Sequence, residues 1–372
     1  MDKSQSPPKN SSKKNDTLDM LIFFVTGRCN AACRHCFYWQ NLGPDHAGLS
    51  LENIERIGKS APHIRTLLLS GGEPTLRSDL PQLVSIFKSN NQIRNVSVPT
   101  NGLLPDRITK IATEIATLDP KLNVSFNLSI DGFAEIHDEI RNVKGNYEKA
   151  MQSLEKLAQL SQQQPNFRVL INTVICADNY DQVIPFARHI ESTGLADGHF
   201  LEIVRGEPPE SRVKSVPAKT LQEIYQQLLP IQAGYLAREA RRRRRGLARP
   251  LREILDVGNL INRYHHQWGR YAQGRKWDFP CMAGEDIGVI DYDGRLRICE
   301  LRSDSVALAD YDYNFTQAWQ SITIRREASI AKTHSCDCTH TCFVGVSMRK
   351  DIKYQLLGAP WRYMLYKMGR VW

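Results

Sequence analysis

The chain has 372 residues, of which 41% are hydrophobic and 24% are charged, and its formal net charge is +9. These are ordinary values for a globular protein, and they exclude a collagen-like, mucin-like or wholly disordered chain. At roughly 150 residues per domain, the length predicts two to three structural units.

The positive charge is concentrated in residues 1–17, 238–253 and 349–372, and the rest of the chain is net negative. This pattern argues against a uniformly basic nucleic-acid surface. The longest apolar run, from Met20 to Val25, is far shorter than the roughly 20 residues that a membrane span requires, and nothing resembles a signal peptide. We therefore expect a soluble, cytoplasmic protein.

Residues 1–17 contain almost no apolar side chains, so we expect a disordered tail. From residue 18 onward, β-rich runs alternate with helical patterns. The expected strands are Leu18–Val25, Arg65–Ser70, Arg94–Pro99, Leu122–Ile130, Phe167–Ile175 and His199–Arg205. The expected helices begin near Ser50, Asp79, Pro105, Asn146 and Asp178. This alternation predicts an α/β fold, a partial (β/α)6 barrel with its functional loops at the carboxyl ends of parallel strands.

The later part of the chain has a different pattern. Residues 208–280 indicate a helical connector, and Asp293-Gly294 between two alternating runs predicts a hairpin over residues 288–298. The predicted parts are a tail (1–17), a barrel (18–207), a helical connector (208–280), a Cys-rich domain (281–348) and a basic, aromatic C-terminal segment (349–372).

Two basic segments allow more than one interpretation. The run from Arg241 to Arg245 is typical of a solvated helix face, and otherwise it would hold an acidic substrate, nucleic acid or a membrane surface. The segment after Lys350 is typical of a packed terminal helix, with an interfacial membrane anchor as the alternative.

The nine cysteines form two groups and one isolated residue. The first group is Cys29, Cys33 and Cys36, the second is Cys281, Cys299, Cys336, Cys338 and Cys342, and Cys176 stands alone. A reducing cytoplasm disfavours a disulfide framework, so the two groups predict two metal sites. We interpret Cys176 as a small buried apolar side chain.

The first group has the spacing C-x3-C-x2-C on the loop that follows the first expected strand. Three thiolates leave one iron of a four-iron cluster without a protein ligand, and an open coordination position is where chemistry takes place. A zinc site completed by His35 is the alternative.

Together with other motifs, this loop resembles the signature of the radical S-adenosylmethionine (SAM) family. His35 occupies the aromatic position before the last cysteine, and Gly71-Gly72-Glu73-Pro74 resembles the second family motif, which holds the methionyl ammonium of SAM. Ser129 and Arg141 resemble the positions that hold the ribose and the carboxylate of SAM. The resemblance covers about residues 18–205.

The resemblance implies a [4Fe-4S] cluster on Cys29, Cys33 and Cys36 whose open iron chelates SAM. In the family, one electron breaks a carbon–sulfur bond of SAM, and the resulting 5′-deoxyadenosyl radical takes a hydrogen atom from the substrate. The implied partner is a low-potential electron donor such as flavodoxin or ferredoxin.

The second cysteine group resembles the auxiliary-cluster extension of one branch of the family, the twitch or SPASM type. The full SPASM pattern has seven cysteines, whereas this chain offers five: Cys281, Cys299, Cys336, Cys338 and Cys342. We therefore expect one auxiliary [4Fe-4S] cluster, with zinc held by four of these cysteines as the alternative. The spacing leaves open whether Cys336 or Cys338 is a ligand.

Glu300 directly follows Cys299, where some relatives carry an acidic residue that acts as a base toward substrate. The alternative is a solvated side chain that pairs with Arg302. His340 is either a spare ligand or a packed imidazole.

We expect a radical SAM enzyme that modifies a peptide or protein. Oxidation of a small metabolite is the second hypothesis, and an iron–sulfur electron carrier or a zinc-stabilised binding module is the non-enzyme alternative. A carrier has no use for an open iron or a SAM site, so cleavage of SAM distinguishes these classes.

Overall fold

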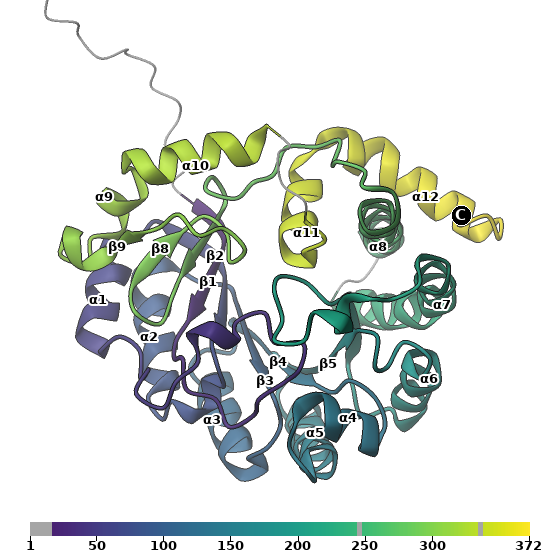
Figure 1. Cartoon of the computed structure of the whole chain (residues 1–372), viewed down its shortest axis with the longest axis horizontal. Coiled ribbons are helices and arrows are strands. Elements are labelled where there is room, and N and C mark those ends of the chain that lie inside the picture. Colours follow the sequence, from purple (N-terminus) through teal and green to yellow (C-terminus); the bar gives the residue numbers. More distant parts are fainter. Residues whose placement is uncertain (1–16, 244–247, 334–337) are drawn as a thin grey trace, which may run out of the picture.

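The computed structural model describes residues 17–243, 248–333 and 338–372, and within them one curved sheet organises the protein (Figure 1). Six parallel strands form its first part in the order β6-β5-β4-β3-β2-β1. They are β1 (Thr17–Phe24), β2 (His63–Ser70), β3 (Asn95–Thr100), β4 (Asn123–Ser129), β5 (Phe167–Ile175) and β6 (Gly198–Ile203). This confirms the predicted partial (β/α)6 barrel. The expected tail lies outside the described residues except for Thr17, which already belongs to β1.

Helices connect the parallel strands and cover the outside of the sheet (Figure 1). They are α1 (Leu51–Ser60), α2 (Leu80–Asn91), α3 (Pro105–Thr117), α4 (Ala134–Arg141), α5 (Asn146–Gln163) and α6 (Val183–Thr193). Four of the five expected helices begin within one residue of the predicted position. The α6 start near Asp178 was wrong, because the side chain of Asn179 accepts the N–H of Cys176 and holds the chain in turns until Gln182.

Strand alternation separates a hydrophobic core from the barrel interior. In β4, Phe126 and Leu128 face the helices and are fully buried, whereas Asn127 and Ser129 point into the barrel. The same alternation runs through β5, from Phe167 to Ile175. The apolar side chains of each strand therefore pack against the helices, and the side chains on the opposite face line a polar interior.

The Cys-rich segment extends this sheet. The predicted hairpin is confirmed as β7 (Ile287–Ile290) and β8 (Arg295–Arg297), with Gly294 at a φ of +84° in the turn, and β9 (Val306–Ala307) follows. Because β7 pairs in parallel with β1, the Cys-rich segment joins the sheet of the barrel. Two helices, α9 (Phe315–Trp319) and α10 (Ile322–Lys332), complete this part.

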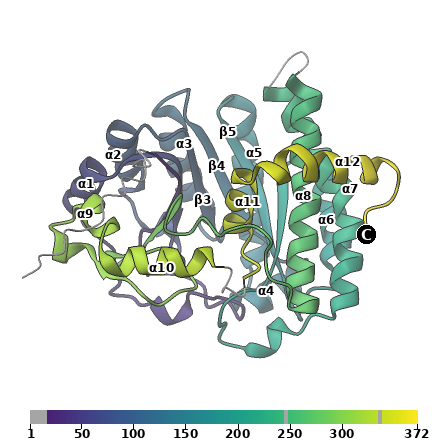
Figure 2. The same cartoon turned by 90° about the horizontal axis from the view of Figure 1, so that it is seen from above.

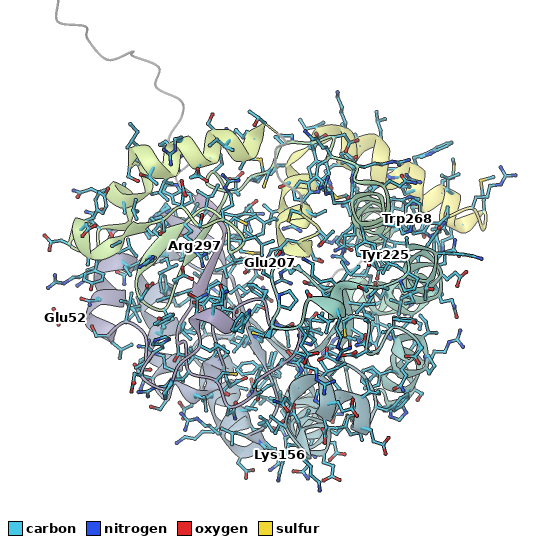
Figure 3. All side chains as sticks on the ribbon, in the orientation of Figure 1. Glu52, Lys156, Glu207, Tyr225, Trp268 and Arg297 are labelled. Carbon is cyan, nitrogen blue, oxygen red and sulfur yellow. The ribbon has the colours of Figure 1, made fainter. Side chains whose placement is uncertain are left out.

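Long helices occupy the predicted connector. α7 (Ala218–Arg243) packs against α6 and β6, and α8 (Ala248–Gln273) lies beside α7 (Figure 2). The rings of Tyr225 and Tyr264 stack between them at 4.2 Å, and Figure 3 shows Tyr225 and Trp268 in this region. Arg242, in the arginine run, pairs with Asp197 at 2.5 Å, while residues 244–247 lie outside the described part of the chain.

The C-terminal segment packs on α8, as expected for a terminal helix. α12 (Ala359–Lys367) contacts α8, and Trp372 lies 4.2 Å from the ring of His265. Across the described ranges, no helix has both the length and the apolar character that a membrane span demands.

One helix, α11 (Thr341–Lys350), lies across the open side of the barrel (Figure 1). The ammonium of Lys350 lies 3.2 Å from Asp19 of β1 and 3.3 Å from Asp286, and Gln267 of α8 donates to the hydroxyl of Thr341. α11 therefore runs between β1 and α8, from the carboxyl ends of the strands toward their amino ends.

Candidate active site

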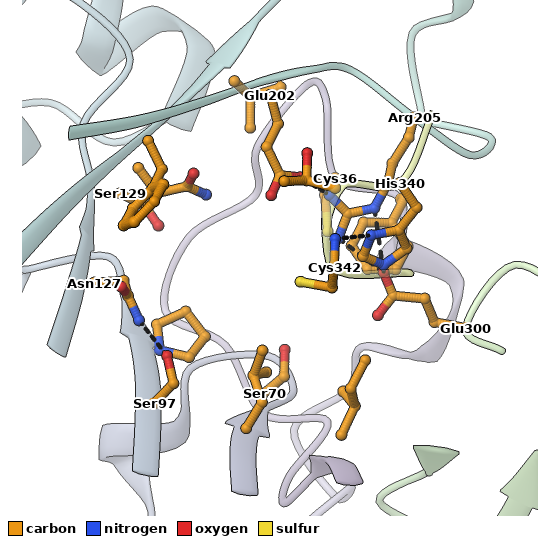
Figure 4. Close-up of a pocket in the computed structure, with 18 of the residues that line it drawn as sticks. Cys36, Ser70, Ser97, Asn127, Ser129, Glu202, Arg205, Glu300, His340 and Cys342 are labelled. Carbon is orange, nitrogen blue, oxygen red and sulfur yellow. Dashed lines mark hydrogen bonds and ion pairs between the residues drawn. The ribbon is translucent and has the colours of Figure 1, made fainter. Parts of the chain in front are cut away.

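A cavity of about 460 Å³ lies inside the barrel, between the parallel strands and α11. Its strand side is polar, because the inward positions of the strands carry small hydroxyl and amide side chains. They include Ser70, Ser97, Asn127, Ser129 and Asn172. In Figure 4, four of these side chains, Ser70, Ser97, Asn127 and Ser129, surround the same space as a group that contains Cys36, Cys342 and Glu300.

The loop that follows β1 brings the first three cysteines to this cavity. Cys29, Cys33 and Cys36 all line it and are partly exposed toward it. Burial raises the pKa of Cys29 to about 12, and the charges of the other two thiols act in the same direction. Three crowded thiols in such a site remain ionised only beside a cation, so the donor set fits an iron–sulfur cluster.

Two glycines let the loop after β2 pack against the cysteine loop. A Cβ on Gly71, whose φ is +139°, would lie 2.3 Å from the carbonyl oxygen of Thr26. A Cβ on Gly72 would lie 2.1 Å from the carbonyl oxygen of Arg28 and 3.1 Å from Cβ of Cys29. These positions require glycine because the two loops touch, whatever ligand they also hold.

Glu73 ties the loops after β2 and β3 together. Its buried carboxylate accepts hydrogen bonds from the hydroxyls of Thr75 and Thr100 at 2.5 and 2.8 Å, and from the N–H of Asn101 at 2.8 Å. Burial raises its pKa despite these donors. Glu73 lines the cavity and Pro74 is buried behind it.

Arg141 and His35 share one partner, Asp131, at the carboxyl end of β4. The carboxylate oxygen Oδ2 of Asp131 accepts from Nε of Arg141 at 2.7 Å and lies 3.0 Å from Nε2 of His35. Although burial opposes ionisation, Arg141 and His35 hold the pKa of Asp131 well below its usual range. Arg141 is thus buried in an ion pair, and its Nη1 lies 3.7 Å from Sγ of Cys33.

The remaining sequence-predicted groups of the barrel lie nearby. Ser129 ends β4 and points into the cavity (Figure 4), which Arg141 and His35 also line. Cys176 is fully buried, as expected, and it is not among the residues that line the cavity.

Four cysteines of the second group are described, namely Cys281, Cys299, Cys338 and Cys342. Cys281, Cys299 and Cys338 are buried in the same core cluster, and burial raises the pKa of Cys299 well above its ordinary value. Backbone N–H groups point at two of them, since His340 donates to Sγ of Cys338 at 3.1 Å and Leu301 to Sγ of Cys299 at 3.4 Å. Such donors are typical of sulfur atoms that ligate iron.

Cys342 differs from these three, because its sulfur points into the cavity (Figure 4). Burial raises its pKa to about 12, and the charges of Glu202 and Glu300 are the next largest influences. Cys336 lies outside the described residues.

Glu300 is buried in a charged network and is not a solvated partner of Arg302, so that alternative was wrong. Its Oε1 accepts from Nη2 of Arg205 at 2.8 Å and contacts the ring of His340, whereas Arg302 pairs with Glu327 at 2.6 Å. Burial alone would raise the pKa of Glu300, but His340 and Arg205 outweigh it and hold the pKa at about 2.

Arg205 connects the two cysteine groups. Its guanidinium lies 4.5 Å above the ring of Phe37, the residue after Cys36, and it pairs with Glu202 at 2.5 Å as well as with Glu300. His340 is fully buried and its Nδ1 accepts the N–H of Cys342 at the start of α11, so it is a packed imidazole in this structure.

Sequence reasoning missed the roles of Asp131, Glu202 and Arg205. The signal that could have found them is position, because all three lie at or just beyond the carboxyl end of a parallel strand.

Within the described ranges, no three His, Cys, Asp or Glu side chains are arranged to hold a single metal ion. A four-iron cluster makes a different demand, since each thiolate binds a different iron atom.

Comparisons with known proteins agree with this fold. The chain is 27% identical over 209 residues to the AdoMet-dependent heme synthase of Oleidesulfovibrio alaskensis, a match that covers 55% of this chain and 51% of that protein. It is 29% identical over 209 residues to a probable GTP 3′,8-cyclase of Methanococcus aeolicus, covering 54% of this chain and 63% of that protein. The chain thus spans about half to somewhat under two thirds of the length of these relatives.

Two solved structures share the fold over most of the chain. The anSMEcpe structure with bound AdoMet superposes with a TM-score of 0.57 at 16% identity, covering 95% of this chain and 94% of that chain. Streptococcus suis SuiB bound to S-adenosylmethionine superposes with a TM-score of 0.55 at 14% identity, covering 91% and 76%. A family model for the Radical SAM superfamily matches residues 23–190 of this chain.

Proposed function

We propose that this protein binds SAM beside the loop that carries Cys29, Cys33 and Cys36 and abstracts a hydrogen atom from a peptide or protein substrate in the barrel cavity. The observation that carries this proposal is that a single cavity is lined by all three of these thiols and by Glu300 and Cys342 from the Cys-rich segment.

When bound, a [4Fe-4S] cluster and SAM supply a 5′-deoxyadenosyl radical by one-electron cleavage of SAM. The role of the chain is to position these groups and to exclude water. The loop after β1 presents the three thiols, and the loops after β2 and β4 close around the same space. α11 covers the open side of the barrel, where water would otherwise enter.

We assign SAM contacts to cavity-lining residues of these loops. The loop Gly71-Gly72-Glu73-Pro74 would hold the methionyl ammonium, Ser129 the ribose, and the guanidinium face of Arg141 that Asp131 does not use would hold the carboxylate. His35 would support the cysteine loop through its hydrogen bond to Asp131.

We further propose one auxiliary [4Fe-4S] cluster at the second cysteine group. Cys281, Cys299 and Cys338 would be ligands, because they belong to one buried cluster and two of them accept backbone N–H groups. Reduction would come from a low-potential donor such as flavodoxin or ferredoxin in the cytoplasm.

The first prediction concerns iron and SAM cleavage. Anaerobically reconstituted protein should carry about eight irons per chain, and replacing Cys29, Cys33 and Cys36 together by Ala should remove about half of them and all SAM cleavage. Iron is measured colorimetrically, and 5′-deoxyadenosine by chromatography after reduction with dithionite. Cys176→Ala is the matched control and should change neither quantity. Cleavage that persists in the triple variant would refute the assignment.

The second prediction separates the structural role of Arg141 from its proposed contact with SAM. Arg141→Gln leaves the buried carboxylate of Asp131 without its main partner, which costs about 3–5 kcal/mol, so the thermal midpoint should fall clearly. The double variant Asp131→Asn/Arg141→Gln removes both charges and should recover most of this stability.

If Arg141 also holds SAM, the double variant should still bind SAM roughly tenfold more weakly than the native protein in anaerobic equilibrium dialysis. Native SAM affinity in the stable double variant would show that Arg141 only supports the fold.

Glu300 is our candidate for the base that accepts a proton from substrate. It lines the cavity, and its Oε1 is already held by Arg205 and His340. This fixes the orientation of the carboxylate before substrate arrives, which is a requirement of positioned base catalysis.

The third prediction tests this assignment. Glu300→Gln keeps the size of the side chain, so both clusters and SAM cleavage should remain while product formation falls by roughly a hundredfold or more. Glu327→Gln, which affects a buried carboxylate paired with Arg302 away from the cavity, is the control. A native rate of product formation would exclude Glu300 as the base, and a loss of auxiliary iron would instead make it a structural residue.

Peptide or protein modification is our leading substrate class. Two neighbours in fold were solved with peptides, namely anSMEcpe with AdoMet and Cp18Cys peptide and SuiB bound to precursor peptide SuiA. Conversion of a small metabolite is the second candidate, because the relatives found by sequence include a heme synthase and GTP 3′,8-cyclases.

The fourth prediction decides between these classes. Lysate of the encoding organism, grown in deuterated medium, is separated by ultrafiltration into polypeptides and small molecules, and each fraction is added to the reduced protein with SAM. The polypeptide fraction should transfer deuterium into 5′-deoxyadenosine, as measured by mass spectrometry. Transfer from the small-molecule fraction alone would establish the second candidate. The triple cysteine variant is the blank.

A further inference from the structure

The cavity contains two positive charges that the proposed roles leave unused. Arg263 of α8 and Arg349 of α11 both line it, and neither forms an ion pair with any residue in the described part of the chain. The Nε of Arg263 is buried and has no hydrogen-bond partner among these residues. The ring of Tyr264 lies 5.9 Å from its guanidinium carbon.

Every other charged side chain that lines this cavity has a partner. Glu73 accepts hydrogen bonds from Thr75, Thr100 and Asn101, Arg141 pairs with Asp131, and Arg205 pairs with Glu202 and Glu300. The helical wall formed by α8 and α11 therefore carries an excess of two positive charges.

Arg349 faces the cavity and not the protein core. Its Nη1 folds back toward Gly345, where a Cβ would lie only 3.6 Å away, and Gly345 itself lines the cavity. The side chain keeps solvent-accessible surface, and desolvation lowers its pKa. Asp19 and Cys342 both act on Arg349 electrostatically, but the carboxylate of Asp19 already pairs with Arg65 and Lys350, and burial raises the pKa of the Cys342 thiol to about 12.

The position of Arg349 along α11 shows which end of the cavity it lines. Cys342, Gly345 and Arg349 lie on one face of the helix, and Arg349 is seven residues, about 10 Å at 1.5 Å per residue, beyond Cys342. The N-terminal end of α11 adjoins Glu300 and the carboxyl ends of the strands, whereas its C-terminal end adjoins Asp19 near the start of β1. Arg349 therefore lies deeper in the barrel than the proposed reaction site.

When ligands fill the cavity, they remove water from the guanidinium groups of Arg263 and Arg349. Desolvating a charge that has no partner is unfavourable in free energy. An oxyanion compensates for this loss with charge-assisted hydrogen bonds, for which guanidinium is well suited. We infer that the substrate carries an oxyanion, a carboxylate or a phosphate, that enters the barrel first and binds Arg263 and Arg349. This inference rests on the proposed function, which places substrate in this cavity.

The test uses the reconstituted protein with saturating SAM and no reductant, so that the carboxylate of SAM is already in place. Glutarate, its uncharged analogue glutaramide and inorganic phosphate are titrated calorimetrically. Glutarate or phosphate should bind at least tenfold more tightly than glutaramide, and added salt should weaken this binding. Tighter binding of glutarate identifies a carboxylate, and tighter binding of phosphate identifies a phosphate.

Variants then locate the bound anion. Arg263→Gln and Arg349→Gln should each weaken its binding roughly tenfold or more, and the corresponding Lys variants should lose less because they keep the charge. Arg252→Gln removes an exposed charge that pairs with Asp256 on the same helix and should leave the affinity unchanged. Circular dichroism and iron content verify that the variants are folded and loaded.

Three results would overturn the inference: no preference for anions over glutaramide, unchanged anion affinity in both Gln variants, or a loss of iron in these variants without a change in anion affinity. The last would assign the two arginines to a cluster. SAM cleavage is measured separately on the same preparations, so failure of the proposed function is distinguished from failure of the anion site.

Discussion

The active end of this barrel depends on one continuous chain of buried hydrogen bonds between loops. Glu73 accepts the N–H of Asn101, the carbonyl of Asn101 accepts from Asn146, Asn146 contacts His137, and Nδ1 of His137 accepts the N–H of Asp131. Asp131 then binds His35, Arg141 and the N–H of Val174. The loops that follow β1 to β4 and the end of β5 are thus held in one arrangement. A buried polar network of this kind is rigid only when every member has a partner.

This network explains why several motif residues serve the fold as well as a ligand. Gly71 and Gly72 are glycines because the loop after β2 touches the cysteine loop, and Arg141 is needed because Asp131 is buried. A residue that a motif assigns to a ligand can therefore support neighbouring loops at the same time. Charge-neutralising double variants are the appropriate way to separate the two roles.

The second half of the molecule completes the cavity and does not form a separate body. β7 extends the sheet from β1, α11 covers the open side of the barrel, and α8 holds α11 through Gln267. Arg205 contributes the contact between the two cysteine groups, stacking on Phe37 and pairing with Glu300. Both ends of the sequence therefore contribute to one site, which is a consequence of parallel β/α topology with a C-terminal segment on the open edge.

The sequence by itself determined the barrel, because strand alternation and helix periodicity are local properties, and the cysteine spacing together with Gly71-Gly72-Glu73-Pro74 indicated the resemblance to the radical SAM family. The Asp-Gly turn likewise predicted the hairpin of β7 and β8. Only the tertiary structure decided that Glu300 faces Arg205 and His340, that Arg141 is buried against Asp131, and that Arg263 and Arg349 enter the same cavity. These partners are far apart in sequence, and their pairing depends on which side of a strand or helix turns inward, a property that no local pattern records.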